Sequence, residues 1–545
     1  MKIGIDFDNT IAKYDKLFVD VALSEGFIGE ELGGYDKTAL RDHLRKQPYG
    51  ETSWMKLQGL VYGQHMVGAE LMPGVTRFLM KCKLRRYQVF VVSHKTEFGH
   101  FDSNNVPLRK EAMKWMTDKR FFDSDYLDLK KTNVFFADNR KDKVAKLAEL
   151  QCDYFIDDLA EVFANHGFPA NTRKILFSNN HKVIADQIAD FVNDWQGIDD
   201  YIFGCTSIAD VSMWFTMLFN LSVNRVDEVP RGGNSNIYKI YASDDNEYAT
   251  KVYPDRSDDR RSRLTTEYRA IEFLQSNGVN NIPKAIIGDE NLGLGIYSWI
   301  NGISVEKPDF HDLQDAIGFI QKLHHLSRFS QNEDIGAATE ACLSANHLVE
   351  QVENRLDNLL LVSSEQPSLQ FFLTEEFVPI WKRLREHSLA SWPNSTRCDD
   401  LRYDYQVLSP SDFGFHNALK QCNELSFVDF EYFGWDDPVK LTVDFIWHPA
   451  MNLKDADVLH WEESMIEIFS LDPEFEIRLC AAKPLYGMRW AMIVLNKFLP
   501  GFKVSRGIAL ETYAGYSESV LEQQLIKAKY YCKAVMEYYP QIAVT

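Results

Sequence analysis

The chain has few cysteines, 8 in 545 residues, scattered and without a Cys-x-x-Cys pair. Neither a disulfide framework nor a structural zinc site is therefore expected, and the thiols are expected to be reduced. Basic residues are also scarce beside acidic ones, 59 against 79, and the formal net charge is −20. A general nucleic-acid binder needs a basic surface to displace counterions, so we expect no nucleic-acid partner.

Long apolar runs are missing as well. The apolar segment at the N-terminus is too short for a signal peptide, and an aspartate follows it at once. The most apolar later stretch, 208–223, contains Asp210 and several hydroxyl groups and is too short to cross a bilayer. We therefore expect a cytoplasmic protein that does not insert into a membrane.

What the chain does have is a globular composition, with 45% hydrophobic and 13% aromatic residues, and enough length for two or three domains. Up to about residue 195, β-rich runs alternate with helical patterns, which indicates a parallel sheet with helices on both faces. Residues 14–72 interrupt this alternation and are expected to form a small helical cap. The expected strands are 2–6, 88–93, 133–137, 154–156 and 174–177, and the expected helices are 75–84, 107–117 and 141–150.

The pattern of expected strands and helices changes after this N-terminal α/β domain, 1–195. Residues 196–226 have the pattern of a linker with an amphipathic helix, and Gly-punctuated strands follow over 227–302. Helical patterns dominate 303–545, interrupted by loops and short strands over 409–438. We therefore expect a second domain of α+β class over 227–545, with a small β-rich lobe and a large helical lobe.

Acidic and hydroxyl side chains stand at the ends of the N-terminal strands. Asp6 and Asp8 follow the first strand, and two residues apart on an extended chain they point the same way. Asp6 is placed to be a nucleophile toward phosphorus and Asp8 a general acid/base. Ser93 ends another strand and is suited to bind a phosphate oxygen. Asp157 and Asp158 end a third strand, and we expect them to hold Mg²⁺ together with Asp6 and Asp8.

A lysine would complete this arrangement by balancing the charge of a phosphoaspartate. Lys143, near the start of a predicted helix, is the first choice, and Lys141 and Lys146 stay open as alternatives. These pieces, in this order, resemble the haloacid dehalogenase (HAD) superfamily over about residues 1–190. The resemblance implies a Rossmann-like parallel sheet with a small helical cap, and a Mg²⁺-dependent phosphatase acting on a phosphate monoester.

The C-terminal domain begins with a pattern suited to nucleotide phosphates. A glycine pair lets backbone N–H groups approach phosphate closely, and nearby polar side chains add donors. Lys251 lies on the second strand, and Glu267, sixteen residues later, is placed to hold that lysine against ATP. Tyr297 and Trp299 belong to the expected hinge, 296–300, whose backbone is expected to bind adenine. The expected phosphate-loop residues are Gly232, Gly233, Ser235 and Asn236.

The most specific pattern is an Asp followed five residues later by an Asn and then by an apolar strand that ends in Asp. Asp412 is expected to accept the proton of a substrate hydroxyl, and Asn417 and Asp429 to hold Mg²⁺. Over about residues 225–540 the chain resembles the aminoglycoside phosphotransferase and choline kinase group, which implies a bilobal protein-kinase-like fold and ATP as cofactor. Pro410 stands where a histidine is common, and Glu431 where Asp-Phe-Gly would have its glycine.

Three functions are compatible with these patterns. The first is a bifunctional enzyme: an ATP-dependent kinase of a small hydroxylated metabolite, a sugar or an amino-alcohol, with a HAD-type phosphatase. The second is an active kinase whose HAD-like domain only binds or regulates, and the third is a non-catalytic scaffold. Trp490 and Tyr486 could pack on a substrate, and an amine could be recognised by the acidic residues Asp399, Asp400, Asp404, Asp436 and Asp437.

Overall fold

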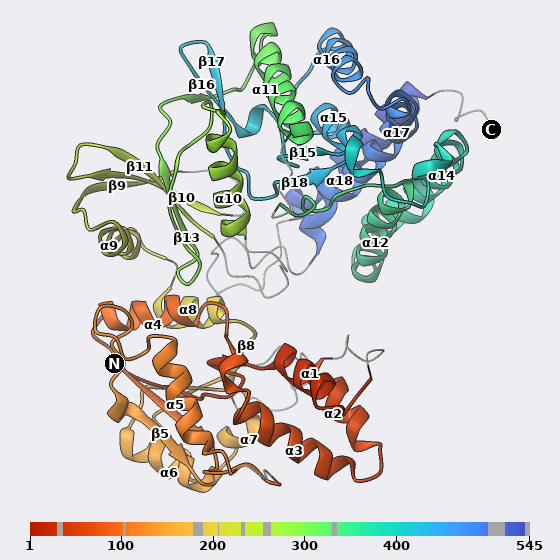
Figure 1. Ribbon diagram of the computed structural model, residues 1–545. Helices are drawn as coiled ribbons and strands as arrows, with labels where there is room; N and C mark the ends of the chain where they lie inside the picture. Colours follow the sequence, from red (N-terminus) through yellow and green to blue (C-terminus); the bar gives the residue numbers. More distant parts are fainter. Residues whose placement is uncertain are drawn as a thin grey trace. The chain divides into compact units, whose positions relative to one another are not determined.

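A computed structural model describes the chain except for residues 30–35, 102–104, 178–188, 205, 230–234, 254–262, 330–334, 500–517 and 540–545. The chain divides into two compact units (Figure 1). Unit 1 is built from Met1–Thr206, and unit 2 from Ser207 onward apart from two short segments. Each unit has its own sheet and its own helices.

Unit 1 contains a six-stranded sheet in which every neighbouring pair is parallel. Its strands are rich in apolar residues, which suits a sheet covered on both faces. The five expected strands are confirmed to within one residue at their ends, and a sixth lies at the edge. In spatial order the strands are β5 (Val134–Ala137), β4 (Gln88–His94), β1 (Lys2–Ile5), β6 (Tyr154–Asp157), β7 (Arg173–Phe177) and β8 (Asp190–Val192).

The first strand, β1, occupies the middle of this sheet. Ile5 is paired with Val91 of β4 on one side and with Ile156 of β6 on the other. The chain therefore runs outward from β1 in both directions, and β1 marks a topological switch point. In open parallel sheets the crevice at the carboxyl ends of such strands is where ligands bind. The residues that follow β1, β4 and β6 are those expected to carry the chemistry.

Helices cover this sheet and form the cap. Within the expected cap, 14–72, the described residues form helices joined by turns and a two-residue strand, β3 (Glu70–Leu71), which pairs with β2 (Ala12–Lys13) just before the cap. The cap helices are α1 (Asp15–Ser24), α2 (Lys37–Arg45) and α3 (Gly50–Tyr62). The others are α4 (Val75–Leu84), α5 (Leu108–Asp118), α6 (Arg140–Leu150), α7 (Ala160–Phe163) and α8 (Trp195–Phe203).

The expected linker, 196–226, differs from the structure at both ends. Helix α8 belongs to unit 1, where Trp195 is buried against Phe78 of α4, and α9 (Ile208–Phe219) belongs to unit 2. The last residues of the expected linker begin a strand, β9 (Val223–Val229), because they pair with β10 (Asn236–Ala242). Among the described residues no single helix is long and apolar enough to cross a membrane, although α8 and α9 pass that test as a bent pair.

Unit 2 begins with an antiparallel five-stranded sheet and continues with helices. In spatial order the strands are β12 (Ala285–Asp289), β13 (Leu294–Ser298), β11 (Glu247–Val252), β10 and β9, and α10 (Arg263–Ser276) packs against β12 and β13. Two hairpin-like sheets follow in the helical lobe: β14 (Ile303–Ser304) with β16 (Ala418–Gln421) and β17 (Glu424–Phe427), and β15 (Val407–Ser409) with β18 (Gly434–Asp436).

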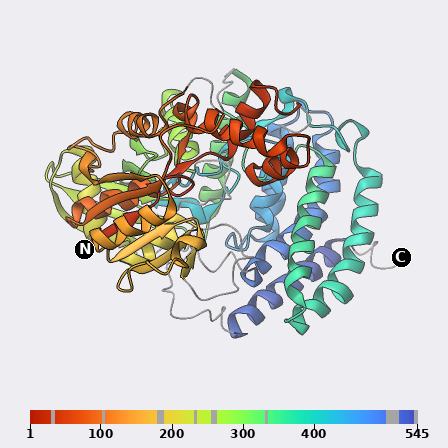
Figure 2. The ribbon, with the colours of Figure 1, turned by 90° about the horizontal axis from the view of Figure 1, so that it is seen from below.

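The helical lobe shares one continuous hydrophobic core with α10 and β13. Long helices run alongside one another in it, as Figure 2 shows for the segments coloured from green-teal to blue. This α+β architecture agrees with the expected two-lobed organisation. The helices are α11 (Phe310–Phe329), α12 (Ala345–Ser363), α13 (Pro367–Phe371), α14 (Val378–Ser391), α15 (Pro438–Trp447), α16 (Asp455–Ile468), α17 (Phe475–Ile493) and α18 (Glu518–Tyr538).

Candidate active sites

A pocket of about 330 Å³ opens at the carboxyl ends of β1, β4 and β6. Asp6, Ser93 and Asp158 line it, each directly at or after its strand. Side-chain oxygens of Asp6, Asp157 and Asp158 lie within 4.8 Å of one another, and the first two residues are almost fully buried. The parallel sheet thus brings together carboxylates that are about 150 positions apart in the chain.

Lys143 is the lysine that forms ion pairs with these carboxylates. Its Nζ lies 2.5 Å from Oδ1 of Asp6 and 2.6 Å from Oδ2 of Asp157, and the side chain is buried. Lys146 instead pairs with Glu149 at 2.9 Å. Of the three lysines considered from the sequence, Lys143 is therefore the one that the fold places in the pocket.

The three clustered carboxylates carry more negative charge than Lys143 balances. Burial raises the pKa of Asp6, although Lys143 opposes the shift, and burial raises the pKa of Asp157 to about 7. Burial and the neighbouring Asp6 raise the pKa of Asp158 well above its usual range. Carboxylates that are reluctant to ionise together gain most from a hard divalent cation, so this donor set suits Mg²⁺.

Asp8 lies apart from this group. Its Oδ1 accepts a hydrogen bond from the Tyr14 hydroxyl at 2.6 Å and from Nζ of Lys95 at 3.0 Å. The sequence predicted Asp8 both as a general acid/base and as a metal ligand. Its side chain lines the same pocket as Asp6 but is not among the three carboxylates that lie within 4.8 Å of one another, and both roles stay predictions. Neither Tyr14 nor Lys95 was singled out as a functional residue from the sequence.

The cap contacts the sheet domain through Lys37, the first residue of α2. Its Nζ donates to Oδ1 of Asn9 at 2.7 Å and lies 4.6 Å from the ring centre of Phe18 and 3.3 Å from the Tyr62 hydroxyl. Asn9 in turn donates to Asp158 at 3.2 Å. Lys37, which lies among aromatic rings, is therefore one contact between the cap and the sheet domain, together with the hydrogen bond from Tyr14 to Asp8.

Unit 2 has a second cluster of charges, centred on Lys251 of β11. Its Nζ lies 2.7 Å from Oε2 of Glu267 on α10 and 2.6 Å from Oδ1 of Asp429, which follows β17. Burial disfavours the ammonium, but the carboxylates of Asp429 and Glu267 outweigh it and raise the pKa of Lys251 well above its usual value. The expected Lys–Glu pair is thus present and is buried rather than exposed.

Glu431 joins this cluster, although the sequence marked it only as a departure. Its side chain is almost fully buried, with Arg263 at 3.2 Å, Lys251 at 3.6 Å and the hydroxyl of Ser235 at 3.2 Å. Oxygens of Glu267, Asp429 and Glu431 lie within 4.8 Å of one another. Glu431 is thus a third carboxylate in the region expected to hold nucleotide phosphates.

The expected phosphate-loop residues fall only partly within the described chain. Gly232 and Gly233 lie outside the described residues. The Ser235 side chain is buried against Glu431, whereas Asn236, the first residue of β10, is exposed. Ser235 therefore stands beside the charge cluster in this structure, and Asn236 begins the strand that follows the loop.

Asp412 and Asn417 lie on one loop between β15 and β16. Nδ2 of Asn417 donates to the backbone carbonyl of Asp412 at 2.9 Å and lies 3.4 Å from its Oδ2. The backbone N–H of Val428 donates to the carbonyl of Asn417 at 2.9 Å, which brings this loop next to Asp429. The three residues predicted from their spacing thus come from one folded region.

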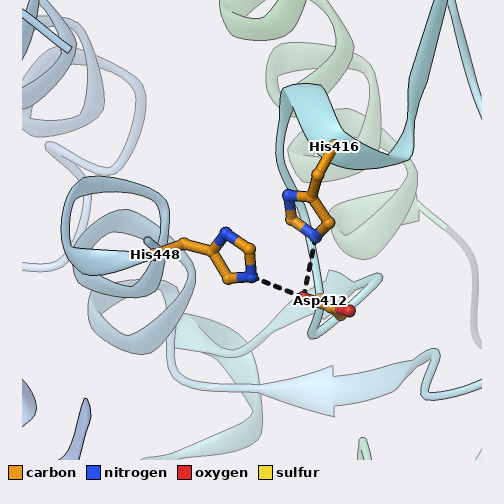
Figure 3. Close-up of side chains that lie close together, drawn as sticks. All are labelled: Asp412, His416 and His448. Atoms are coloured by element: carbon orange, nitrogen blue, oxygen red, sulfur yellow. Dashed lines mark hydrogen bonds and ion pairs between the residues drawn. The ribbon is translucent and has the colours of Figure 1, made fainter. Parts of the chain in front are cut away.

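Two imidazoles flank the Asp412 carboxylate, and Figure 3 shows Nε2 of each facing it. Nε2 of His416 lies 3.0 Å from Oδ1 of Asp412, and Nε2 of His448 lies 3.9 Å from the same atom. Burial by itself would raise the pKa of Asp412, but the hydrogen bond from His416 and the electrostatic effects of His416, His448 and Lys440 together outweigh it and lower that pKa to about 2. No residue spacing pointed to these histidines, since His448 is contributed by the end of α15.

The two residues named in the expected hinge, whose backbone is predicted to bind adenine, differ in their side-chain surroundings. The Tyr297 side chain is buried within the sheet, and its hydroxyl lies 2.8 Å from that of Tyr253, which donates to Glu267. Its ring is therefore a core group, and the contact of the backbone with adenine stays a prediction. Trp299 follows β13, and its indole N–H donates to Asn301 at 3.0 Å.

The acidic residues expected to recognise an amine are engaged elsewhere. Asp436 is completely buried against Lys440 at 3.0 Å, and Asp437 is paired with Arg478 at 3.0 Å. Asp404 forms an exposed pair with Arg402 at 2.6 Å. The further candidates have these positions: Asp399 is exposed, Asp400 faces His347 at 3.6 Å, Tyr486 is buried in the core, and Trp490 is half-buried beside His448. Amine recognition by Asp436 and Asp437 is therefore wrong.

No family model matches the chain. A search of curated proteins finds no match either. Among solved structures, the spectinomycin phosphotransferase in complex with ADP and spectinomycin shares 11% identity, with a TM-score of 0.43, over 61% of this chain and 98% of that one. The choline kinase LicA from Streptococcus pneumoniae shares 14% identity, with a TM-score of 0.39, over 59% of this chain and 98% of that one. The amicoumacin kinase hAmiN, solved with AMP-PNP and Ca²⁺, shares 13% identity, with a TM-score of 0.37, over 56% and 87%.

Proposed function

We propose that unit 2 is an ATP-dependent kinase of a small hydroxylated metabolite, such as a sugar or an amino-alcohol. The observation that carries this proposal is Lys251, buried at 2.7 Å from Glu267 and 2.6 Å from Asp429, with Asp412 and Asn417 on the adjacent loop. Transfer of a γ-phosphoryl group is mainly a matter of positioning and charge stabilisation, and these are the groups that it requires.

The residues present are suited to hold ATP and Mg²⁺. Asn417 and Asp429 offer the oxygen ligands that Mg²⁺ prefers, and the ion would neutralise the β- and γ-phosphates. Lys251 binds phosphate oxygens through its ammonium group, while Glu267 fixes the direction of the lysine. Asp412 stands beyond Asn417, where an acceptor hydroxyl would approach.

The transfer step follows from this arrangement. The acceptor oxygen forms a bond to the γ-phosphorus, the bond from that phosphorus to the β,γ-bridging oxygen breaks, and ADP leaves. The hydroxyl proton passes to a carboxylate oxygen of Asp412. With a pKa of about 2 that carboxylate is a weak base, so its contribution is to orient the hydroxyl and to accept the proton late in the transfer.

The test is a metabolite screen for ATP consumption with the full chain, with products identified by mass and phosphorus NMR. Asp412→Asn should lower turnover by about 10²-fold or more while MgADP still binds, and Asp429→Asn should weaken MgADP binding as well. Asp404→Asn is the matched control, because Asp404 is an exposed, ion-paired aspartate in the same lobe. Near-normal turnover in Asp412→Asn or Asp429→Asn would contradict the proposal.

A second function is supported by the pocket of unit 1, namely hydrolysis of a phosphate monoester by a HAD-type mechanism. The specific observation is that Lys143 bridges Asp6 and Asp157 beside Asp158 and Ser93. A carboxylate oxygen of Asp6 attacks phosphorus, the P–O bond to the leaving group breaks, and Asp8 protonates the leaving alkoxide. Asp8 then takes a proton from water, which attacks phosphorus and releases phosphate and Asp6.

Mg²⁺-dependent hydrolysis of p-nitrophenyl phosphate tests this second function. Asp6→Asn should abolish it and leave ATP-dependent phosphorylation intact, whereas Asp412→Asn should do the reverse. Asp128→Asn, a change of an exposed aspartate that pairs with Lys130, is the matched control. If the wild type is inactive on a broad panel of phosphate esters, unit 1 is a binding or regulatory domain, which is the alternative inferred from the sequence.

The two reactions run in opposite directions on phosphate esters. Acting at one position of one metabolite, they would only hydrolyse ATP, so we propose distinct substrates, distinct positions or successive steps.

The reduced thiols and short apolar runs of the chain favour a cytoplasmic location for both reactions. Fractionation of cells that express the full chain, followed by detection in the soluble and membrane fractions, tests that location.

A further inference from the structure

The carboxylate of Asp412 is held by an imidazole that the transfer step described above does not use. Nε2 of His416 lies 3.0 Å from Oδ1 of Asp412, within hydrogen-bond distance, and the same view shows His448 beside it, also facing Asp412 (Figure 3). His448 is 3.9 Å from Oδ1, too far for a hydrogen bond. His416 is therefore the group in direct contact with the proposed base.

We propose that His416 is the positioning residue of the kinase site: it donates its Nε2–H to Oδ1 of Asp412 and so leaves Oδ2 to receive the acceptor hydroxyl. This inference rests on the kinase function proposed above. The direction of the hydrogen bond follows from the partner, because an ionised carboxylate only accepts. Nδ1 of His416 is buried and has no hydrogen-bond partner among the residues that the structure describes, so the contact of the ring with Asp412 is its polar anchor.

Oδ2 is the oxygen of Asp412 that lies on the side of Asn417, one of the residues proposed to hold Mg²⁺. Nδ2 of Asn417 lies 3.4 Å from it, and the same amide donates to the backbone carbonyl of Asp412 at 2.9 Å. The two oxygens of one carboxylate thus have different neighbours, His416 on Oδ1 and Asn417 near Oδ2. Rotation of the carboxylate about its Cβ–Cγ bond would exchange them, and the hydrogen bond from His416 opposes that rotation.

Neighbouring side chains restrict the His416 ring. His448 stacks on it with ring centres 3.8 Å apart and planes 11° apart. Trp490 contacts His448 edge-on at 4.9 Å. At Gly414, two residues before His416, an added Cβ would lie 2.8 Å from Nδ1 of His416 and 2.6 Å from Sδ of Met451. Glycine at this position therefore leaves room for the imidazole, and the ring has little freedom to turn.

His448 supports the stack as an uncharged ring. Burial lowers its pKa to about 4, and the neighbouring His416 adds to the effect, so it is neutral near physiological pH. Its Nδ1 accepts the backbone N–H of Ala450 at 3.3 Å. A neutral His448 does not compete with the hydrogen bond from His416, because its Nε2 lies 3.9 Å from Oδ1 of Asp412.

Orientation matters here because the carboxylate is a weak base. With a pKa of about 2, Asp412 gains little from basicity and depends on the geometry of its free oxygen. Misplacing a catalytic group by about 1 Å can cost roughly 10²-fold in rate. Loss of the His416 contact should therefore lower kcat, whereas nucleotide binding, which depends on Lys251 and Asp429, should stay unchanged.

The test compares three variants of the full chain. His416→Leu removes the donor, His416→Gln keeps an N–H donor of similar reach, and Gly414→Ala presses on the ring. With MgATP as the probe and water as the acceptor, we expect a fall in turnover of about 10- to 100-fold in the Leu and Ala variants and of less than about 5-fold in the Gln variant. The Kd for MgADP should stay within about 2-fold of wild type in all three. His311→Leu, in an exposed His–Asp pair of α11, is the matched control.

A second readout does not depend on turnover. In ¹⁵N spectra of the histidine-labelled full chain, the proton of His416 should lie on Nε2, and its resonance should shift in Asp412→Asn. A proton on Nδ1, or equal turnover in His416→Leu and His416→Gln, would overturn the inference. Absence of MgADP binding by the wild type would instead overturn the kinase function, so the two failures are distinguishable.

Discussion

The lysine of the unit 1 pocket shows what single residues contribute. The sequence offered three lysines within six positions of one helix, and spacing alone could not choose between them. The choice depends on the phase of α6 against the sheet, which turns Lys143 inward with Val144 and Leu147 and leaves Lys146 beside Glu149. Phase is set by packing between elements, so it becomes visible only in the folded molecule.

Replacing Lys143 by Met should abolish the phosphatase activity. Without the ammonium group, the buried Asp6 and Asp157 repel each other and a phosphoaspartate is left unbalanced, so we expect a loss of about 10²-fold or more. The measurement is Mg²⁺-dependent hydrolysis of p-nitrophenyl phosphate. Lys146→Met should retain at least half of the activity, and equal losses in the two variants would show that Lys143 has no special place.

The buried His448 predicts a pH dependence of stability. Its pKa is about 4 in the folded chain and near 6.5 when unfolded, so the unfolded chain binds the proton first as the pH falls. The contribution of His448 is thus fully present above about pH 6.5 and is lost between about pH 6.5 and pH 4. Urea unfolding of wild type and His448→Gln should show the stability difference falling by about 2 kcal/mol from about pH 7.5 to pH 5. A constant difference would contradict this assignment.

At the scale of helices and strands, patterns of apolar residues predicted much of unit 1. Its five expected strands and three expected helices lie where alternation and helical periodicity placed them. The pairing of β9 was missed, because Val223–Val226 carry too few apolar residues to stand out and are ordered by their neighbour β10. Strand alternation turns the Tyr297 side chain toward Tyr253 and the core, which leaves the backbone of this residue for the predicted contact with adenine.

Helices α15 and α17 are joined by a buried ion cluster that could not be foreseen from spacing. Arg478 donates to Asp437, the N-terminal cap of α15, at 3.0 and 3.1 Å, and to Asp472 at 2.7 Å. The Arg478 side chain is completely buried. Two acids far apart in sequence thus neutralise one guanidinium, and the helix that carries His448 is held in place by this contact.

Arg478→Leu should destabilise unit 2 strongly. It leaves two buried carboxylates without a partner, and breaking such a cluster typically costs about 3–5 kcal/mol. Chemical unfolding of the full chain, followed by tryptophan fluorescence, measures the change. The double variant Arg478→Leu with Asp437→Asn should recover part of the loss, and a single variant as stable as wild type would rule out the structural role.

The whole molecule combines two units with separate charge clusters. The division into an N-terminal α/β unit and a C-terminal α+β unit follows from composition and rhythm, while the details of substrate recognition do not. Lys37 contacts Asn9, and His448 stacks on His416, so these contacts join segments that are distant in the sequence. Such contacts leave no fixed spacing in a single sequence.

Separate sites predict separate responses to ligands. In calorimetry of the full chain, MgADP at about 100 times its Kd should stabilise unit 2 by about 2.7 kcal/mol and raise its transition by roughly 5 °C. Mg²⁺ with inorganic phosphate should raise the transition of unit 1 instead. Asp429→Asn should remove only the first shift and Asp6→Asn only the second, whereas loss of both shifts in either variant would contradict two independent sites.

The contact between Lys251 and Asp429 has a consequence for how a nucleotide enters. The ammonium of Lys251 and the carboxylate of Asp429 satisfy each other at 2.6 Å, so each of these charges has a partner of opposite sign. An incoming anion must displace Asp429 from Lys251, and an incoming cation must displace Lys251 from Asp429, instead of meeting unpaired charges. Nucleotide affinity should accordingly change little with ionic strength, in contrast to the steep screening that exposed charges undergo.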